Sequence, residues 1–190
     1  MIKALAKRVA HVLLGDFSIY RIYRWRVGEG SGGREGGSGE EALRIAPLDA
    51  AALAGAAPEL ADLDDYLGDG CEAFGCWSGG TLIGAAFYWH GQRYASRGYW
   101  PLQPGEAKLV QITVSEAARG RGVARALIGT SSIEMRERGF GALYARVWHS
   151  NVSSSRAFEA AGWSHIATVI ETEPLLLGRR RWVMRPSPRT

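Results

Sequence analysis

The chain has 190 residues, of which 46% are hydrophobic and 22% charged, enough for one domain with an apolar core. Two cysteines exclude a disulfide-rich scaffold, the longest apolar runs are too short to span a membrane, and the start lacks the pattern of a signal peptide. These three observations leave a cytoplasmic protein as the expectation. The positive excess behind the net charge of +4 is confined to the two ends, which argues against a nucleic-acid-binding domain.

Residues 1–27 are expected to form a basic amphipathic segment, because apolar residues fall on one side of a helical wheel and basic residues on the other. The apolar set is Ile2, Leu5, Val9, Val12 and Leu13, and the opposite set is Lys3, Lys7, Arg8 and His11. Aromatic residues then alternate with arginines over residues 17–26. The segment either docks on its own domain or on a second subunit, or lies on an anionic membrane surface.

A Gly- and Ser-rich stretch over residues 28–39 is interpreted as a flexible linker to a domain over residues 40–187. The domain has the pattern of a mixed α/β fold. Strands are expected at 42–46, 71–77, 81–89, 108–114, 142–148, 165–171 and 180–185, and helices at 49–56, 59–67, from about 120 to 139, and at 153–161. Cys71 and Cys76 point to opposite faces of one strand, so neither a disulfide nor a metal site is expected.

The turn between strand 108–114 and the next helix is the most informative stretch. It reads Arg119-Gly-Arg-Gly-Val-Ala124, with two glycines and two arginines at a helix start. Glycines let a phosphate approach the backbone, and the free N–H groups of a helix N-terminus point toward it. The stretch matches neither a Walker A loop nor a dinucleotide fingerprint. It is interpreted as an anion-binding turn, most naturally for a pyrophosphate, with an ordinary helix cap as the simpler alternative.

A second block, residues 151–163 (NVSSSRAFEAAGW), follows after one helix and one strand. Together the two blocks resemble the acyl-CoA signatures of the GCN5-related N-acetyltransferase (GNAT) family, with a weaker echo in the glycine of Thr81-Leu-Ile-Gly84. The resemblance covers about residues 41–186. Two positions depart from the pattern: Glu116 stands where many members have proline, and Phe158 stands where the usual tyrosine would protonate the leaving thiolate.

The resemblance implies an α/β fold of GNAT type, with a central, mostly antiparallel mixed sheet flanked by helices, and acetyl-CoA as co-substrate. It implies that two strands splay apart and that the pantetheine arm of CoA pairs with the exposed edge of residues 111–114. The implied CoA-binding residues are Gln111, Ile112, Val114, Arg119, Gly120, Arg121, Gly122, Val123, Ala124, Asn151, Ser154 and Phe158.

The expected reaction is direct transfer of an acetyl group to an amine or hydroxyl. The backbone N–H of Ile112 could polarise the thioester carbonyl. Because Phe158 cannot donate a proton, either the thiolate leaves without a dedicated acid, or Ser155 or Tyr144 substitutes, or the chain only binds acyl-CoA. Glu106 is the first candidate for the general base, ahead of His90 and His149, although each of the three could be structural.

The acceptor is expected to contact the aromatic connection after strand 81–89, at Trp89, His90, Arg93, Tyr94 and Trp100. Rings with polar and cationic neighbours suit a small-molecule or sugar-like acceptor, although they could simply cover the sheet edge. The alternative function is a non-catalytic acyl-CoA-binding regulatory or interaction module. A homodimer and contact of residues 1–27 with a membrane surface are further expectations.

Overall fold

The computed structural model describes residues 16–26, 28, 43–96, 100–173 and 180–185, and its strands form one eight-stranded mixed sheet. The order across the sheet is β2-β3-β4-β5-β6-β1-β7-β8, and every neighbouring pair is antiparallel except β5 and β6. The strands are β1 (Asp16–Arg26), β2 (Arg44–Pro47), β3 (Cys71–Ser78), β4 (Thr81–His90), β5 (Glu106–Val114), β6 (Ala142–Trp148), β7 (Ser164–Glu173) and β8 (Arg180–Met184). The expected fold class, a mostly antiparallel mixed sheet flanked by helices, is confirmed.

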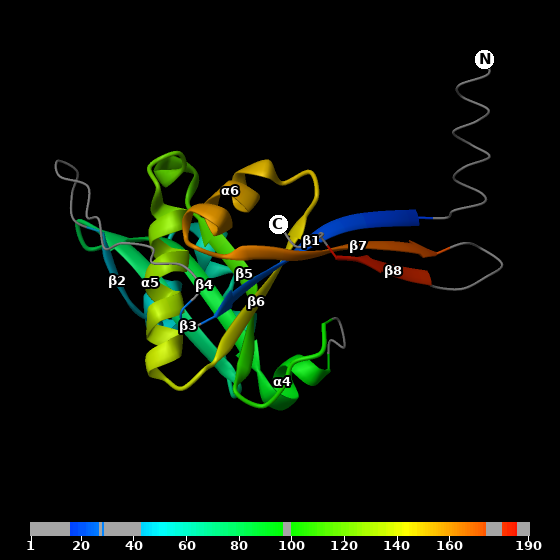
Figure 1. Cartoon of the computed structure of the whole chain (residues 1–190). Helices are drawn as coiled ribbons and strands as arrows, with labels where there is room; N and C mark the ends of the chain where they lie inside the picture. The colour runs from blue at the N-terminus through cyan, green and yellow to red at the C-terminus, as the bar shows by residue number, and fades with distance from the viewer. Residues whose placement is uncertain (1–15, 27, 29–42, 97–99, 174–179, 186–190) are drawn as a thin grey trace, which may run out of the picture.

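Helices cover both faces of this sheet. They are α2 (Ala50–Ala54), α3 (Pro58–Ala61), α4 (Gly91–Ala95), α5 (Val123–Glu137) and α6 (Val152–Ala160), with short 3-10 turns η1 (Asp64–Tyr66) and η2 (Glu116–Ala118). The long helix α5 crosses the sheet, with α6 beside it (Figure 1). We call the face covered by α5 and α6 the helix face. Side chains from α2 and α3 pack on the opposite face, which we call the open face.

Glycine at one position allows α5 to lie close to β4. A Cβ atom on Gly84 would meet the carbonyl oxygen of Thr113 at 3.3 Å and Cγ1 of Val123 at 3.4 Å. Val123 and Leu127 can therefore pack directly on the sheet at the start of the helix. This contact fixes the beginning of α5 next to the end of β5.

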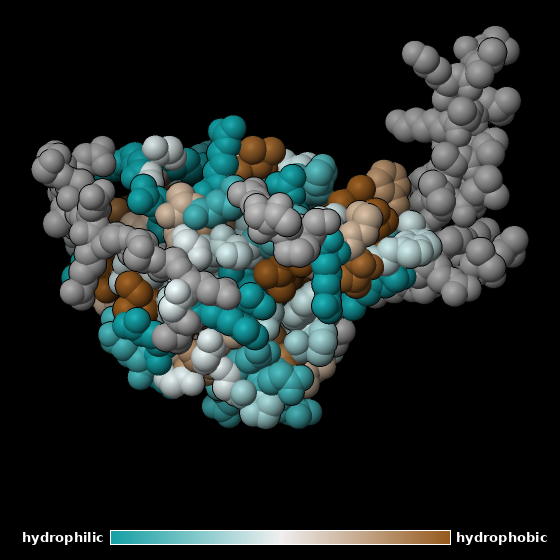
Figure 2. All heavy atoms as spheres, in the orientation of Figure 1, coloured by the Kyte–Doolittle hydropathy of each residue, from teal (hydrophilic) through white to brown (hydrophobic). Residues whose placement is uncertain are grey.

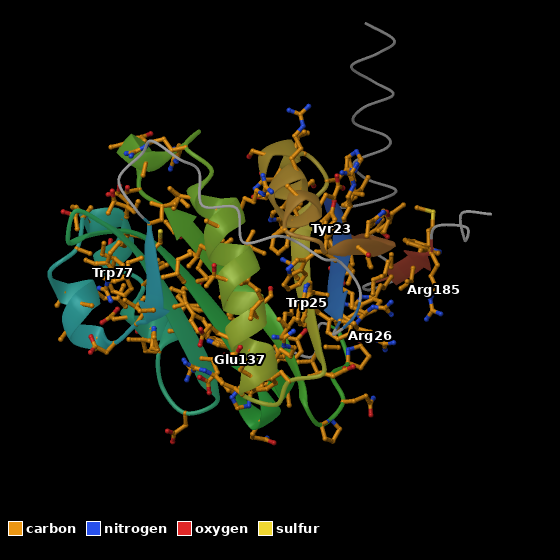
Figure 3. All side chains as sticks on the ribbon, turned by 60° about the vertical axis from the view of Figure 1, so that its left-hand side comes forward. Tyr23, Trp25, Arg26, Trp77, Glu137 and Arg185 are labelled. Atoms are coloured by element: carbon orange, nitrogen blue, oxygen red, sulfur yellow. The ribbon has the colours of Figure 1, made fainter. Side chains whose placement is uncertain are left out.

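Strand β1 corrects the expected domain boundary. The sequence pattern places residues 16–26 in a segment outside a domain that begins at residue 40, but these residues pair with β6 on one side and with β7 on the other. Tyr20, Ile22 and Tyr23 are fully buried, and Trp25 lies between β1 and α5 (Figure 3). These side chains therefore belong to the core and cannot sit among lipid headgroups. The expected helix over residues 2–13 and almost all of the expected linker lie outside the described residues.

The far ends of β1, β7 and β8 extend from the rest of the sheet as an arm (Figure 1). Apolar side chains gather on it (Figure 2), among them Phe17, Trp182, Val183 and Met184, each between 47% and 65% exposed. Among the described residues, none of the helices is long and apolar enough to cross a membrane. Membrane contact and homodimerisation stay predictions.

Because Ile22 is fully buried in a central strand, replacing it with alanine should lower the free energy of unfolding by about 3 kcal/mol. Ile19 lies on the same strand but is only half-buried, so Ile19→Ala is a matched control that should cost clearly less. Urea unfolding of both variants measures the difference. Equal and small effects would contradict the placement of β1 in the core.

Candidate functional site

The central feature of the site is the separation of β5 from β6. The two strands pair in parallel from Glu106–Leu109 to Ala142–Ala145 and then part. Strand β5 continues to Val114 alongside β4, whereas β6 continues to Trp148 alongside β1. Within the described part of the chain, residues 110–114 therefore have a backbone partner on one side only. Their other edge presents N–H and C=O groups that a ligand can satisfy.

A β-bulge lies where the strands part. The pairing of β4 with β5 shifts by one residue, leaving Val110 as the extra residue. Leu109 and Ile112 both pack on the helix face, whereas Val110 packs with the α2–α3 cluster on the open face. The Gln111 side-chain amide donates a hydrogen bond to the Thr113 hydroxyl at 3.0 Å. The bulge thus twists the free edge just where it begins.

The turn after β5 has the geometry of an anion site. Gly120 and Gly122 adopt φ of +77° and +76°, a left-handed conformation that L-residues rarely adopt, and Gly122 is the N-cap of α5. The first N–H groups of α5 have no acceptor within the helix, and its dipole adds partial positive charge. Arg121 is exposed there, whereas Arg119 pairs with Glu116 at 3.3 Å.

The second block starts helix α6. The Asn151 side chain caps this helix, its oxygen accepting a hydrogen bond from the Ser154 N–H at 3.0 Å. Phe158 is only 2% exposed, and its ring stacks on that of Tyr23 with centroids 5.6 Å apart. The block therefore has a structural role, since it orients α6 over the part of the sheet that contains β1.

Tyr23 lies in the segment that the sequence pattern places outside the domain, so its position beside the site was not expected. It lies opposite Ala145, which in turn lies opposite Leu109, so it is level with the point where β5 and β6 part. Its hydroxyl donates to the Glu159 carboxylate at 2.8 Å, and burial raises its pKa. The Ser155 hydroxyl is also buried and accepts a hydrogen bond from Arg21.

Glu106 lies on the open face, at the end of β5 where that strand still pairs with β6. One carboxylate oxygen accepts a hydrogen bond from the Tyr144 hydroxyl at 3.1 Å, and the other accepts one from the Gln103 N–H at 2.8 Å. Burial and the neighbouring carboxylate both raise the pKa of Tyr144, which therefore stays protonated at neutral pH. Val110 is four residue steps along the extended chain from Glu106, a rise of roughly 13 Å.

Two of the five residues expected to contact the acceptor, Tyr94 and Trp100, lie close to Glu106 and Tyr144. We call these four residues the Glu106 cluster. The Tyr94 hydroxyl accepts a hydrogen bond from the Trp100 N–H at 3.0 Å and one from the buried Lys108 ammonium at 3.3 Å. The Trp100 ring lies 6.2 Å from that of Tyr144. Tyr94 and Trp100 therefore line the same part of the open face as Glu106.

Trp89 and Arg93 make contacts that hold the chain around η1. The Trp89 indole donates to the Tyr66 carbonyl at 2.9 Å. Arg93 donates to the carbonyls of Asp65 and Leu67 at 2.9 and 2.8 Å, and its guanidinium lies 4.3 Å from the Trp89 ring. These contacts give both side chains a structural role, away from the free edge of β5.

The two candidate histidines also lie apart from the cluster. His90 is 4.0 Å from the Glu72 carboxylate and packs its ring against Phe140 at 5.0 Å. His149 is exposed just beyond β6, where its backbone N–H donates to the Ile19 carbonyl at 2.9 Å. The structure thus brings Glu106, rather than either histidine, into the cluster with Tyr94 and Trp100.

Comparison with known proteins supports the fold. The family model described as the acetyltransferase (GNAT) family matches residues 42–163. A protein from Novosphingobium aromaticivorans assigned to the GNAT family is 18% identical over 84% of this chain and 65% of its own, with a TM-score of 0.57. A GNAT-family acetyltransferase from Colwellia psychrerythraea is 18% identical over 88% of this chain and 60% of its own, also at 0.57. The chain thus spans less than two thirds of both proteins.

An aminoglycoside N-acetyltransferase solved in complex with CoA is 22% identical over 64% of this chain and 92% of its own, with a TM-score of 0.50. At these identities the likeness of the solved structures shows the fold. No curated protein matches the sequence closely enough to count as a relative.

Arg121→Glu should weaken acetyl-CoA binding about tenfold, because it replaces an exposed positive charge at the glycine turn with a negative one. Arg136→Glu, at the other end of α5, is the matched control and should leave the affinity unchanged. Calorimetric titration with acetyl-CoA gives both dissociation constants. Equal affinities for Arg121→Glu and the wild type would contradict the anion-site assignment.

Proposed function

The chain belongs to the acetyltransferase (GNAT) family, and from this premise we propose that it transfers an acetyl group from acetyl-CoA to an amine or hydroxyl of a small-molecule acceptor. One observation carries the proposal: a single stretch, residues 110–124, supplies both an unpaired strand edge and a left-handed glycine turn at a helix start. These are the two features that a long ligand with amide groups at one end and a pyrophosphate at the other requires.

Acetyl-CoA fits this stretch by its chemistry. Its pantetheine arm carries amide groups that can pair with the free edge of β5 as a neighbouring strand would. The pyrophosphate then reaches the N–H groups of residues 120–124 and the Arg121 side chain. In this orientation the thioester lies near Val110, where β5 and β6 part. We propose that the expected cofactor-binding residues between Gln111 and Ala124 act in this way, whereas Asn151, Ser154 and Phe158 contribute through the position of α6.

The reaction needs a neutral amine, an acceptor for the proton that the amine loses, and a donor for the proton that the CoA thiolate gains. The amine lone pair attacks the thioester carbonyl carbon, the C–S bond breaks, the amine loses a proton and the CoA thiolate gains one. Backbone N–H groups of β5, that of Ile112 among them, stabilise the oxyanion that forms on the carbonyl. The protein therefore supplies position and hydrogen-bond donors, and the bond changes occur between the two substrates.

We propose Glu106 as the final acceptor of the amine proton. Because roughly 13 Å of extended chain separates it from Val110, the proton must pass through an intermediary. The Tyr144 hydroxyl, which donates a hydrogen bond to Glu106, is one such group, and a water molecule would complete the route. The thiolate is a good leaving group and can take its proton from solvent, which accommodates phenylalanine at position 158.

The alternative, a module that binds acyl-CoA without turnover, is favoured by one observation. Phe158 stands where the family pattern has a tyrosine, and its side chain has no hydroxyl to protonate the thiolate. Its ring is instead buried against Tyr23. The two functions differ in whether CoA is released. A cytoplasmic location is proposed together with either function, and membrane-surface contact is proposed only for the part of residues 1–27 that precedes β1, because Tyr20, Ile22 and Tyr23 of β1 are buried in the core.

Incubation with acetyl-CoA and a panel of primary amines should release free CoA thiol and yield acetylated product, detected by a thiol reagent and by mass spectrometry. Tight acetyl-CoA binding without release on any acceptor would favour the binding module instead.

The rate should rise with pH, about tenfold per unit while the acceptor amine remains mostly protonated, because only the neutral amine is a nucleophile. Glu106→Gln should lower kcat about a hundredfold with acetyl-CoA affinity unchanged. Glu137→Gln, exposed at the end of α5, is the control. An unchanged kcat in Glu106→Gln would rule out its role as proton acceptor.

A further inference from the structure

Strand β8 is the last strand of the sheet and lies on the projecting arm. Within the described residues, β7 is the only strand beside it. The arm carries four of the six large hydrophobic side chains that are exposed in the described part of the chain (Figures 1 and 2). The four are Phe17, Trp182, Val183 and Met184. Apolar side chains gathered in this way on one projection indicate a surface that binds another molecule.

The apolar surface of β8 covers both of its faces. Val183 lies opposite Val169, which belongs to the same apolar cluster as Tyr144 on the open face. Because successive residues of a strand alternate, Trp182 and Met184 lie on the helix face. Trp182 and Met184 are each 50% exposed and Val183 is 47% exposed. A partner that pairs with the edge of β8 would therefore cover apolar side chains above and below the sheet.

The opposite edge of the sheet is less suited to pairing. Strand β2 has only four residues and ends at Pro47, which has no backbone N–H group. The guanidinium of Arg44 covers the Trp77 ring there, 4.4 Å from its centroid. Among the described residues, none of the large exposed hydrophobic side chains belongs to β2. A further strand is thus better accommodated beside β8.

The sequence of β8 favours one antiparallel register with a copy of itself. A two-fold axis normal to the sheet must pass through a residue of β8, because residues that lie opposite each other point to the same face. An axis at residue 181 would place Arg181 opposite itself, and one at residue 183 would place it opposite Arg185. Like charges directly opposite each other are unfavourable. An axis at Trp182 avoids both arrangements and pairs the whole strand, Arg180–Met184.

In this register the exposed side chains of the two copies cover one another. The two Trp182 rings meet at the axis on the helix face, and such cross-strand aromatic pairs are stabilising. On the open face Val183 lies beside the aliphatic stem of the partner's Arg181. The Arg181 charge is balanced within its own chain, because its guanidinium donates to the Glu171 carboxylate at 2.9 Å.

The shape of the molecule permits this pairing. The arm projects from the rest of the sheet, and β8 runs from the tip of the arm back toward the body (Figure 1). Two antiparallel arms therefore lie side by side with the bodies of the two copies at opposite ends. The free edge of β5 is separated from β8 by β6, β1 and β7, so the pairing leaves it accessible.

We propose that the arm binds a second copy of this chain, by antiparallel pairing of the two β8 strands about Trp182. The sheets of the two copies then join into one continuous sheet. The proposal goes beyond acetyl transfer and does not depend on it.

Light scattering coupled to gel filtration tests the proposal with the full chain. At roughly 50 μM the wild type should have twice the mass of one chain. Trp182→Glu and Trp182→Lys should each weaken the dimer at least tenfold, because either variant places two like charges opposite each other at the axis. Val152→Glu is the matched control, since Val152 is 52% exposed but lies on α6, and it should dimerise like the wild type.

Mixing the two charged variants tests the register itself. Only a residue on the two-fold axis lies opposite its own copy, so Trp182→Glu and Trp182→Lys together should form a mixed dimer with opposite charges at the axis. Circular dichroism checks that each variant is folded. Trp182→Ser, which removes the ring without adding charge, should weaken the dimer as well and replaces the charged variants if these do not fold.

Three results would overturn the proposal. A wild type that stays monomeric up to roughly 500 μM would show that the arm does not bind a second copy. If this monomer also sediments with anionic phospholipid vesicles and Trp182→Ser does not, the arm binds a lipid surface instead. A dimer that persists in the folded Trp182 variants uses another surface, and charged variants that stay monomeric on mixing exclude a two-fold axis at Trp182.

Discussion

The site depends on how β6 divides its backbone hydrogen bonds between two neighbours. Strand β1 pairs with all seven residues of β6, from Ala142 to Trp148, whereas β5 pairs with only the first four. Because β6 stays with β1 to its end, β5 loses its partner after Leu109. Among the residues that the structure describes, the polar groups of residues 110–114 then have no strand partner on the side of β6, and backbone groups of this kind favour a ligand that supplies the missing partners. An N-terminal strand that the sequence pattern placed outside the domain thus helps to create the binding edge.

The same separation gives the site two chemically distinct sides. The helix face is packed with apolar side chains from α5 and α6 and ends at the glycine turn, where helix N–H groups and Arg121 suit a pyrophosphate. The open face carries Glu106, Tyr144 and Lys108 beside aromatic rings. A donor bound from one side and an acceptor approaching from the other would meet at Val110, where the bulge twists the strand.

The sequence predicted the features that lie in one continuous stretch. Strands 108–114 and 142–148, the turn at residues 119–124 and the following helix were each found from local patterns, and the structure has all of them. Strand β1 was missed because it lies between two neighbours and is buried on both faces, so it lacks the simple alternation of apolar and polar residues that marks a half-buried strand. The acceptor side was predicted less well because its residues come from β1, β5 and β6, whose pairing no local pattern reveals. Aromatic enrichment alone did not separate Trp89, which anchors η1, from Trp100, which lies beside Tyr144.

Amide hydrogen exchange with and without acetyl-CoA tests the central claim most directly, because it reports which backbone groups acquire partners. The account predicts that acetyl-CoA slows exchange in residues 110–114 and 120–124, with little change in β3 and β8. Slower exchange confined to other parts of the sheet, or no change along residues 110–124 at saturating acetyl-CoA, would contradict the assignment of the free edge of β5 as the binding site.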